Sequence, residues 1–274
     1  MPAIDHVRAM LERQLRELES SEAGVRSGAD PEDLHRFRVA TRRSRALIRA
    51  SRPLVRDQLG NLDRELRWLG GASGAVRDLD VMIEHLRDLI GGLEPDQAGG
   101  EAIVAALERE RLEEREELVR AIDTERFRAL IERFESALPT LGSSNGGVSM
   151  KRLVRKEYER LSAAYKALDA DSSDEELHAV RIRAKHVRYA AELAARSGQQ
   201  EYSGLASAAR ALQELIGTHQ DAAVTEQRVR ALAREESRLA AGRIVEAERR
   251  RRVEARAKLR DAWRDVKRAA SKAR

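Results

Sequence analysis

The sequence predicts an all-α protein made of two similar helical bundles, and three observations lead to this fold class. Good helix formers such as Ala, Leu, Arg and Glu are frequent in the 274 residues, which include 36% charged residues and only 5 prolines. No segment alternates apolar and polar residues as a half-buried strand does. The first half of the chain also recurs in the second half at a constant spacing.

Turn-forming residues divide the first half into six predicted helices. Asp30 is a predicted N-cap, and Pro31 then occupies the first helical position, where its missing N–H costs nothing. The predicted helices cover the residues before Gly24, Pro31 to about Arg52, Pro53 to the "GGASG" segment at 70–74, about 76–90, and two segments that meet at "DT" near 123 and end at Pro139.

A linker is predicted near the middle of the chain. The segment "PTLGSSNGGVS" at 139–149 is rich in Gly and Ser and carries no charge. We therefore expect a first helical half at 1–138 and a second at 150–274, joined by residues 139–149 within a single domain of residues 1–274.

An internal repeat relates these two halves. An offset of 143 residues maps "LHRFRVATRRSRALIRA" at 34–50 onto "LHAVRIRAKHVRYAAEL" at 177–193. With that offset and no gap, ten of the 48 positions from 34 to 81 are identical, among them His35 and His178 in a chain with only 6 histidines. The sequence therefore predicts two pseudo-symmetric antiparallel helical bundles.

The composition also suggests a compartment. The chain has no cysteine, no apolar run near the roughly 20 residues of a membrane span, and an amphipathic charged start instead of a signal peptide. These features lead us to expect a soluble cytoplasmic protein without a membrane partner. The formal net charge of +5 is too small to indicate a partner by itself, so the position of the charges matters more.

Basic residues form a stripe on the helix that contains each histidine. Because an α-helix turns about 100° per residue, these side chains fall within roughly 80° of one face. The first stripe consists of His35, Arg38, Arg42, Arg45 and Arg49, and the second of His178, Arg181, Lys185 and Arg188. Glu192 replaces the counterpart of Arg49, so the two stripes differ in charge.

Each stripe places like charges three or four residues apart, which destabilises an isolated helix. Solvated helix faces usually alternate the two signs instead. Asp78 and Asp221, which we expect to cap a helix or orient a neighbouring Arg or His, are too few to neutralise these cations. An external polyanion is therefore the simplest predicted partner.

The residue types favour phosphate over nucleic acid. The chain shows no module that enters a DNA groove, and aromatic residues, on which single-stranded bases stack, make up only 3% of it. Guanidinium groups instead bind phosphate oxygens through two parallel hydrogen bonds. Stripes of Arg and Lys thus suit a linear chain of phosphates.

The paired motifs resemble the CHAD family, the conserved-histidine α-helical domain. The resemblance rests on "LHRFRVATRRSRALIRASRP" with "RDLDV" at 77–81, and on "LHAVRIRAKHVRYAAEL" with "QDAAV" at 220–224. It covers nearly the whole chain and implies two helical bundles that bind inorganic polyphosphate without cleaving it, with association to polyphosphate granules in some members. No cofactor is implied.

By position, the resemblance also implies which side chains contact the phosphate chain. The implied contacts are His35, Arg38, Arg42, Arg45, His178, Arg181, Lys185 and Arg188, and Arg49 extends the first stripe. Each histidine has three possible roles: a neutral packing residue, a phosphate donor when protonated, or a metal ligand.

Three rival functions remain open from the sequence. A metal-dependent phosphoesterase would use His35, Asp78, His178 and Asp221, with His186 and His219 as further candidates, although neighbouring arginines would repel a divalent cation. Because such arginines surround each histidine, we expect neither metal nor catalysis. The other rivals are a nucleic-acid binder and an adaptor for an acidic protein.

Overall fold

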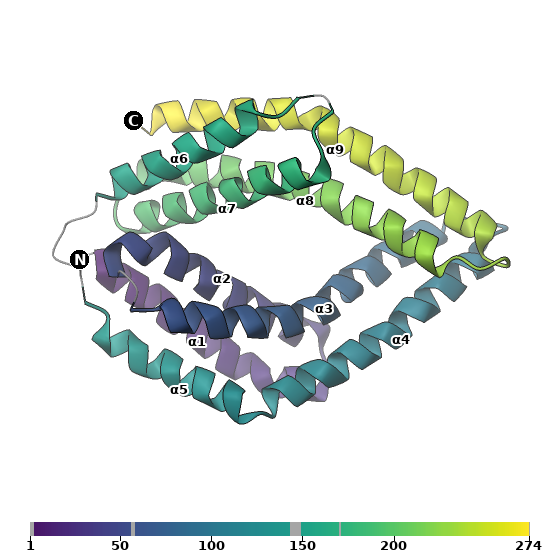
Figure 1. The fold of residues 1–274 in the computed structure, drawn as a ribbon, viewed down its shortest axis with the longest axis horizontal. Coiled ribbons are helices and arrows are strands. Elements are labelled where there is room, and N and C mark those ends of the chain that lie inside the picture. The colour runs from purple at the N-terminus through teal and green to yellow at the C-terminus, as the bar shows by residue number, and fades with distance from the viewer. Residues whose placement is uncertain (1–2, 56–57, 143–148, 170, 274) are drawn as a thin grey trace. The chain divides into compact units, whose positions relative to one another are not determined.

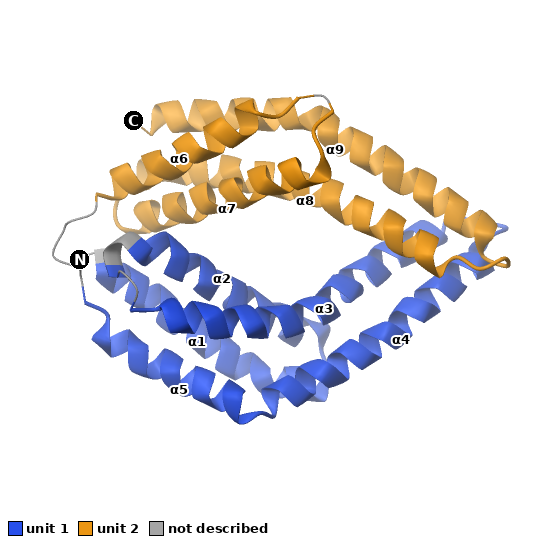
Figure 2. Cartoon of the chain, in the orientation of Figure 1, with its two compact units in different colours: residues 1–147 blue, residues 148–274 orange. Residues whose placement is uncertain are grey.

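A computed structural model describes residues 3–55, 58–142, 149–169 and 171–273 (Figure 1). Every regular element in these residues is a helix, which confirms the predicted all-α class. The chain divides into two compact units, residues 1–147 and 148–274 (Figure 2). The two predicted stripes therefore belong to different units.

The first unit contains five α-helices. Their bounds are α1 Ala3–Ser27, α2 Pro31–Val55, α3 Gly60–Ile90, α4 Gln97–Ile122 and α5 Glu125–Thr140. Consecutive helices pack against each other, and α5 returns to pack on α1 and α3. The first stripe lies on α2, which is therefore held between α1 and α3.

The second unit repeats this order of packing without a helix equivalent to α5. Its elements are α6 Met150–Lys166, α7 Asp174–Arg196, the 3₁₀ helix η1 Gln200–Tyr202, α8 Ser203–Leu232 and α9 Arg238–Lys272. Helix α7, which carries the second stripe, packs between α6 and α8, and α8 packs along α9. In each unit, the helix that bears the stripe therefore packs between the helix before it and the helix after it in the sequence.

Local hydrogen bonds fix where the stripe helices begin. The Asp30 carboxylate accepts a bond of 2.8 Å from the Glu32 amide, which confirms the predicted N-cap before Pro31. Ser173 and Glu176 form a reciprocal capping box at the start of α7. Both caps satisfy amide groups of the first turn, which would otherwise lack a partner.

Helix α2 buries a face next to its basic stripe. Leu34, Phe37 and Ile48 lie in the core of the first unit. Thr41 and Ser44 are also buried, and their hydroxyls donate bonds of 2.9 Å to the carbonyls of Phe37 and Ala40. These bonds satisfy the two polar side chains inside an apolar face, so the stripe side chains are left at the edge of the core.

The predicted break at "GGASG" was wrong, because α3 runs without interruption from Gly60 to Ile90. The glycines lower helix propensity by about 1 kcal/mol each, yet tertiary packing outweighs this cost. A β-carbon at Gly70 would lie 3.5 Å from Cγ2 of Thr41, and one at Gly74 would lie 2.6 Å from Nη1 of Arg38. These positions allow α2 side chains to cross the surface of α3.

Other predicted boundaries shift by a few residues. Helix α1 continues past Gly24 to Ser27, because the glycine with left-handed backbone is Gly28, at φ 66°. Helix α2 includes Pro53 and ends at Val55, since a proline removes only one hydrogen bond so close to a helix end. Of the predicted linker, residues 139 and 140 belong to α5, and residues 143–148 lie outside the described residues.

Among the buried polar residues, His219 of α8 is only 2% exposed. Its Nδ1 lies 3.7 Å from a carboxylate oxygen of Asp174, and no hydrogen bond to that nitrogen is formed within the described residues. Burial first, and then the charges of Arg252 and Arg256, lower the pKa of His219, while Asp174 opposes this shift. The neutral imidazole is therefore favoured.

None of the helices in the described part of the chain combines the length and the apolar character that crossing a bilayer requires.

Replacing Gly71 by Ala should stabilise the protein. A β-carbon at this exposed helical position meets no atom within 4 Å, so the gain in helix propensity should raise the free energy of unfolding by about 1 kcal/mol in urea denaturation. Gly74→Ala is the matched control, because its methyl group would collide with Arg38 and should cancel the gain. A loss of stability in Gly71→Ala would contradict a continuous α3.

Acid should destabilise the protein through His219. Its lowered pKa means that the unfolded chain takes up a proton at a pH where the native imidazole stays neutral, so the free energy of unfolding should fall as pH drops below about 6.5. Urea denaturation between about pH 7.5 and pH 5.5 should show a weaker fall for His219→Gln, which cannot take up this proton. Parallel pH profiles for both proteins would contradict this role.

Candidate functional site

The arginines of the α2 stripe lie along its contact with α3. We call this surface the first seam, and it comprises Arg38, Arg42, Arg45 and Arg49 of α2 with Asp63, Arg67, Gly70, Gly74 and Asp78 of α3. The two helices run antiparallel here, since Arg38 reaches Asp78 and Arg49 reaches Asp63. Residues far apart in the sequence thereby form one row of charge.

Arg38 crosses α3 at Gly74 and ends on Asp78. Its Nη2 donates a hydrogen bond of 2.7 Å to the Asp78 carboxylate. The Asp78 side chain is 71% exposed, so this ion pair faces solvent and contributes little to stability. A dissolved anion can therefore compete for Arg38.

Asp63 forms the other end of the first seam and holds three guanidinium groups. Its carboxylate lies 3.3 Å from Nε of Arg45, 3.3 Å from Nε of Arg49 and 3.9 Å from Nη2 of Arg67. Unlike Asp78, the Asp63 side chain is only 17% exposed. One largely buried carboxylate therefore orders three cations, two of which are well exposed.

Positive charge exceeds negative charge in this seam. Burial and then the neighbouring charge of Arg49 lower the pKa of Arg45, and Arg67 adds to this shift while Asp63 opposes it. Four arginines of the seam, Arg38, Arg45, Arg49 and Arg67, share two carboxylates, Asp63 and Asp78. An additional anion would relieve the repulsion that the shift reports.

Helices α7 and α8 form the second seam in the same register. It comprises Arg181, Lys185 and Arg188 of α7 with Arg210, Gln213, Gly217 and Asp221 of α8. A β-carbon at Gly217 would lie 3.5 Å from Nε of Arg181, and Nη1 of Arg188 lies 3.4 Å from the Gln213 carbonyl oxygen. These contacts repeat those of Arg38 with Gly74 and of Arg45 with Gly70 at the offset of 143.

The second seam is more fully neutralised than the first. Arg188 donates a bond of 2.7 Å to Glu192, and Arg210 donates one of 2.7 Å to Glu214. The position that corresponds to Asp63 is Ala206, which is buried and carries no charge. Arg181 differs from its neighbours, because its buried Nε has no hydrogen-bond partner within the described residues.

The two predicted histidines open the stripes without joining the ion pairs. His35 is half-buried at the start of α2, and His178 is exposed at the start of α7. Neither side chain forms a hydrogen bond or ion pair within the described ranges. Their roles in packing or binding stay predictions.

The residues of the rival metal site are divided between the two units. His35 and Asp78 belong to the first unit, whereas His178, His219 and Asp221 belong to the second. Nδ1 of His186 lies 3.7 Å from Oε2 of Glu157, and this contact lowers the pKa of the Glu157 carboxyl. Within the part of the chain that the structure describes, no three His, Asp or Glu side chains come together as a metal site would require.

Sequence reasoning missed Asp63 and Arg67 in the first seam, and Arg210 and Gln213 in the second. A detectable signal existed in α3, because positions 63, 67, 70, 74 and 78 recur at helical spacing on one face. The predicted break at 70–74 separated these residues into two helices and hid the pattern.

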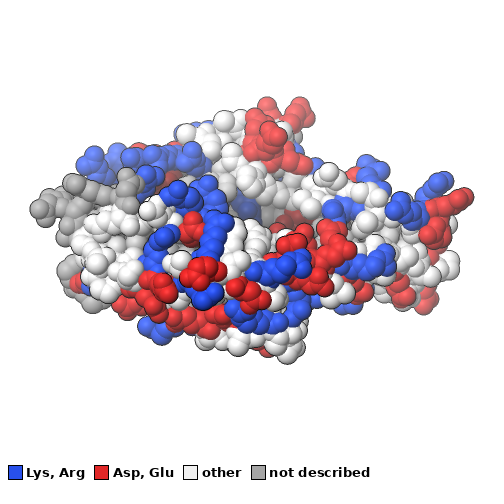
Figure 3. All heavy atoms as spheres, turned by 60° about the horizontal axis from the view of Figure 1, so that its bottom comes forward, with Lys and Arg blue, Asp and Glu red and all other residues white. Residues whose placement is uncertain are grey.

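The two units carry opposite net charges. The first has 23 Lys and Arg against 28 Asp and Glu, and the second has 29 against 19. On the face drawn in Figure 3, basic and acidic side chains lie among one another over much of the surface. A large local excess of one sign, such as that in the first seam, therefore stands out from a mixed background.

Comparisons with known proteins agree with this architecture. A family model described as CHAD domain matches residues 9–230. Two curated relatives from Mycobacterium tuberculosis, Uncharacterized protein MT2285 of strain CDC 1551 / Oshkosh and Uncharacterized protein Rv2226 of strain H37Rv, are each 28% identical over 240 residues. The match covers 82% of this chain and 45% of each relative, so the chain spans about half of their length.

Two solved structures share the fold. PptA from Streptomyces chartreusis has a TM-score of 0.77 and 20% identity, with 96% of this chain and 100% of that chain covered. The CHAD domain from the plant Ricinus communis has a TM-score of 0.66 and 22% identity, with coverage of 100% and 92%. Because the family model spans most of its residues, the chain belongs to the CHAD domain family.

Proposed function

We propose that the protein binds inorganic polyphosphate along the first and second seams and does not cleave it. The observation that carries this proposal is the excess of guanidinium groups over carboxylates in the first seam, where Arg38, Arg45, Arg49 and Arg67 share Asp63 and Asp78. Such an excess is stabilised when an anion binds.

The shape of the seam favours a linear ligand. From Arg38 to Arg49 the axis of α2 rises about 16 Å, and the cations follow this line. A phosphate chain offers negative oxygens at every unit along such a row, whereas a single phosphate would meet only one or two guanidinium groups. Binding of this kind would associate the protein with polyphosphate granules.

The second seam supports the same ligand with fewer free cations. Arg181, Lys185 and Arg188 form a row of cations along α7. The net positive charge of the second unit would also attract anions from a distance. Both features favour binding over catalysis, because they supply positive charge but no nucleophile or general base.

Titration with phosphate chains of defined length tests the proposal. Affinity should fall steeply with salt, since each neutralised phosphate releases counterions. Chain lengths should stay unchanged after long incubation. RNA and DNA at the same phosphate concentration should compete poorly, and preferential binding of either would favour the nucleic-acid alternative.

Reversing two charges in the first seam should weaken binding strongly. Arg38→Glu with Arg42→Glu replaces two predicted contacts by repulsive groups, so polyphosphate affinity should fall at least about 100-fold, as expected when two charge-assisted bonds are lost. Arg36→Glu with Arg43→Glu is the matched control, because these residues lie on α2 outside the stripe. Circular dichroism should show equal helix content, and equal loss of affinity in both variants would contradict the assigned surface.

The two carboxylates of the first seam should respond in opposite directions. Asp78→Asn removes an exposed negative charge and should tighten polyphosphate binding about twofold to fivefold. Asp63→Asn should instead weaken binding about twofold to tenfold, because Arg45, Arg49 and Arg67 lose the buried group that orders them. Isothermal titration calorimetry measures both effects. Tighter binding in both variants would show that Asp63 only competes with phosphate.

A further inference from the structure

A further concentration of positive charge outside the seams lies on α6 and the second half of α9. Helix α6 and residues 256–272 together carry 13 Lys and Arg against four Asp and Glu. The first and fourth helices of the first unit, α1 and α4, do not carry such an excess. Helix α1 has four basic residues against five acidic ones, and α4 has four against seven. The charge is therefore specific to the second unit.

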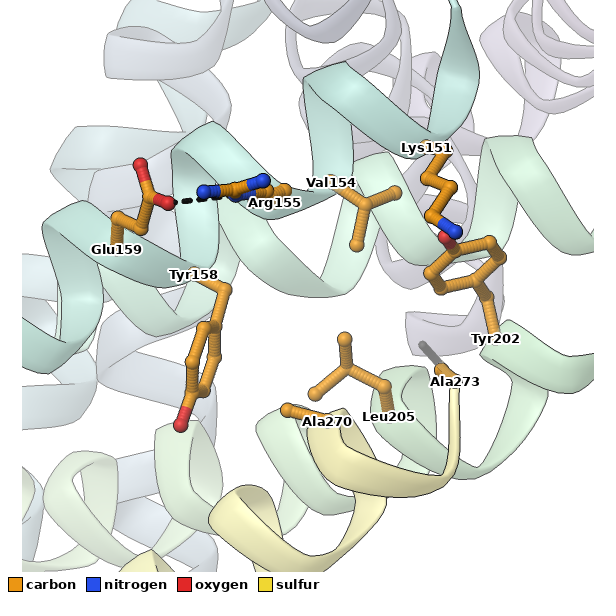
Figure 4. A pocket seen from close by; sticks show the side chains of 9 residues that line it. All are labelled: Lys151, Val154, Arg155, Tyr158, Glu159, Tyr202, Leu205, Ala270 and Ala273. Atoms are coloured by element: carbon orange, nitrogen blue, oxygen red, sulfur yellow. Dashed lines mark hydrogen bonds and ion pairs between the residues drawn. The ribbon is translucent and has the colours of Figure 1, made fainter.

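These two segments lie side by side. Tyr158 and Tyr165 of α6 stack on Trp263 of α9, with ring centroids 6.3 Å and 4.5 Å apart. A pocket of about 360 Å³ is lined from both helices, with Val154 and Ala270 on its wall (Figure 4). Helix α6 and residues 256–272 are thus neighbours, and we call the exposed surface that they form the α6/α9 face.

The α6/α9 face is separate from the second seam. Helix α7 packs between α6 and α8, and α8 packs between α7 and α9, so the helices follow one another around the bundle. The contact between α7 and α8 is therefore opposite the contact between α6 and α9, as Figure 1 shows. A chain bound in the second seam leaves the α6/α9 face open.

Local acids neutralise arginines and leave lysines exposed. Arg155 pairs with Glu159, Arg160 with Glu157, Arg264 with Asp261 and Arg268 with Asp265. These pairs use all four acids of the face. The exposed lysines without a partner in the described residues are Lys156, Lys166, Lys258, Lys267 and Lys272.

The kind of cation also separates this face from the seams. Six of the seven lysines in the chain lie on α6 and α9, and the seventh is Lys185 of the second seam. An ammonium group is a compact, strongly hydrated charge on a flexible stem and lacks the planar geometry of guanidinium. Such groups suit loose contact with a flexible anionic polymer.

We propose that the α6/α9 face is a second, lysine-based binding surface for the phosphate polymer. This inference rests on the proposed function for the identity of the polymer. It adds a separate surface, on the opposite side of the second unit from the second seam.

Lysine footprinting of the full chain tests both claims separately. Limited acetylation followed by mass spectrometry reports each of the seven lysines. Long-chain polyphosphate should protect Lys185 and also, several-fold, Lys258, Lys267 and Lys272. Protection of Lys185 alone would overturn the second surface while supporting the seam, and no protection anywhere would contradict the proposed function as well. Stronger protection of the face by RNA at equal phosphate concentration would assign it to nucleic acid and overturn the proposal.

A charge-matched pair of variants gives an independent test. Lys258→Glu, Lys267→Glu and Lys272→Glu together should reduce the slope of log affinity against log salt by about 2, because three phosphate contacts are lost. The control carries Arg234→Glu, Arg238→Glu and Arg250→Glu, exposed positions outside the face with the same change in net charge. It should keep the native slope. Equal changes in both variants would show an effect of net charge alone and would overturn the proposal.

Discussion

The close approach of stripe arginines to the neighbouring helix is the constraint on which the candidate site depends. Arg38 can lie across α3 because Gly74 has no side chain, and a methyl group there would stand 2.6 Å from its guanidinium. Gly217 leaves the same space for Arg181 on α8. The arginine stems pack against helix surface while their charged ends reach solvent. Repulsion among these cations is thus built into the packing, which is why we propose that an anion would stabilise it.

The two units combine this constraint with different electrostatics. In the first, the largely buried Asp63 orders three arginines at short range within a unit of net negative charge. In the second, Ala206 replaces that carboxylate, while the unit as a whole is strongly basic. We therefore expect the second unit to dominate long-range attraction of a polyanion and the first seam to bind it with better-ordered groups.

Much of the fold was predictable because its signals are local. The stripe of α2 and the buried face containing Phe37 follow from helical periodicity alone. The continuity of α3 through Gly74 was not predictable, because the contact that explains this glycine is made by Arg38, which crosses α3 from α2. Asp63 was missed for the same reason, because its relation to Arg45 exists only after the helices pack. The internal repeat and the roles of His35 and His178 stay predictions.

The most direct measurement of the central claim is a crystal structure of the protein with a polyphosphate chain of defined length. If polyphosphate binds in the seams, consecutive phosphates should lie within hydrogen-bond distance of Arg38, Arg42 and Arg45 in the first seam, and of Arg181 and Arg188 in the second. Phosphates bound only outside both seams, with the Arg38–Asp78 and Arg45–Asp63 pairs unchanged, would contradict it.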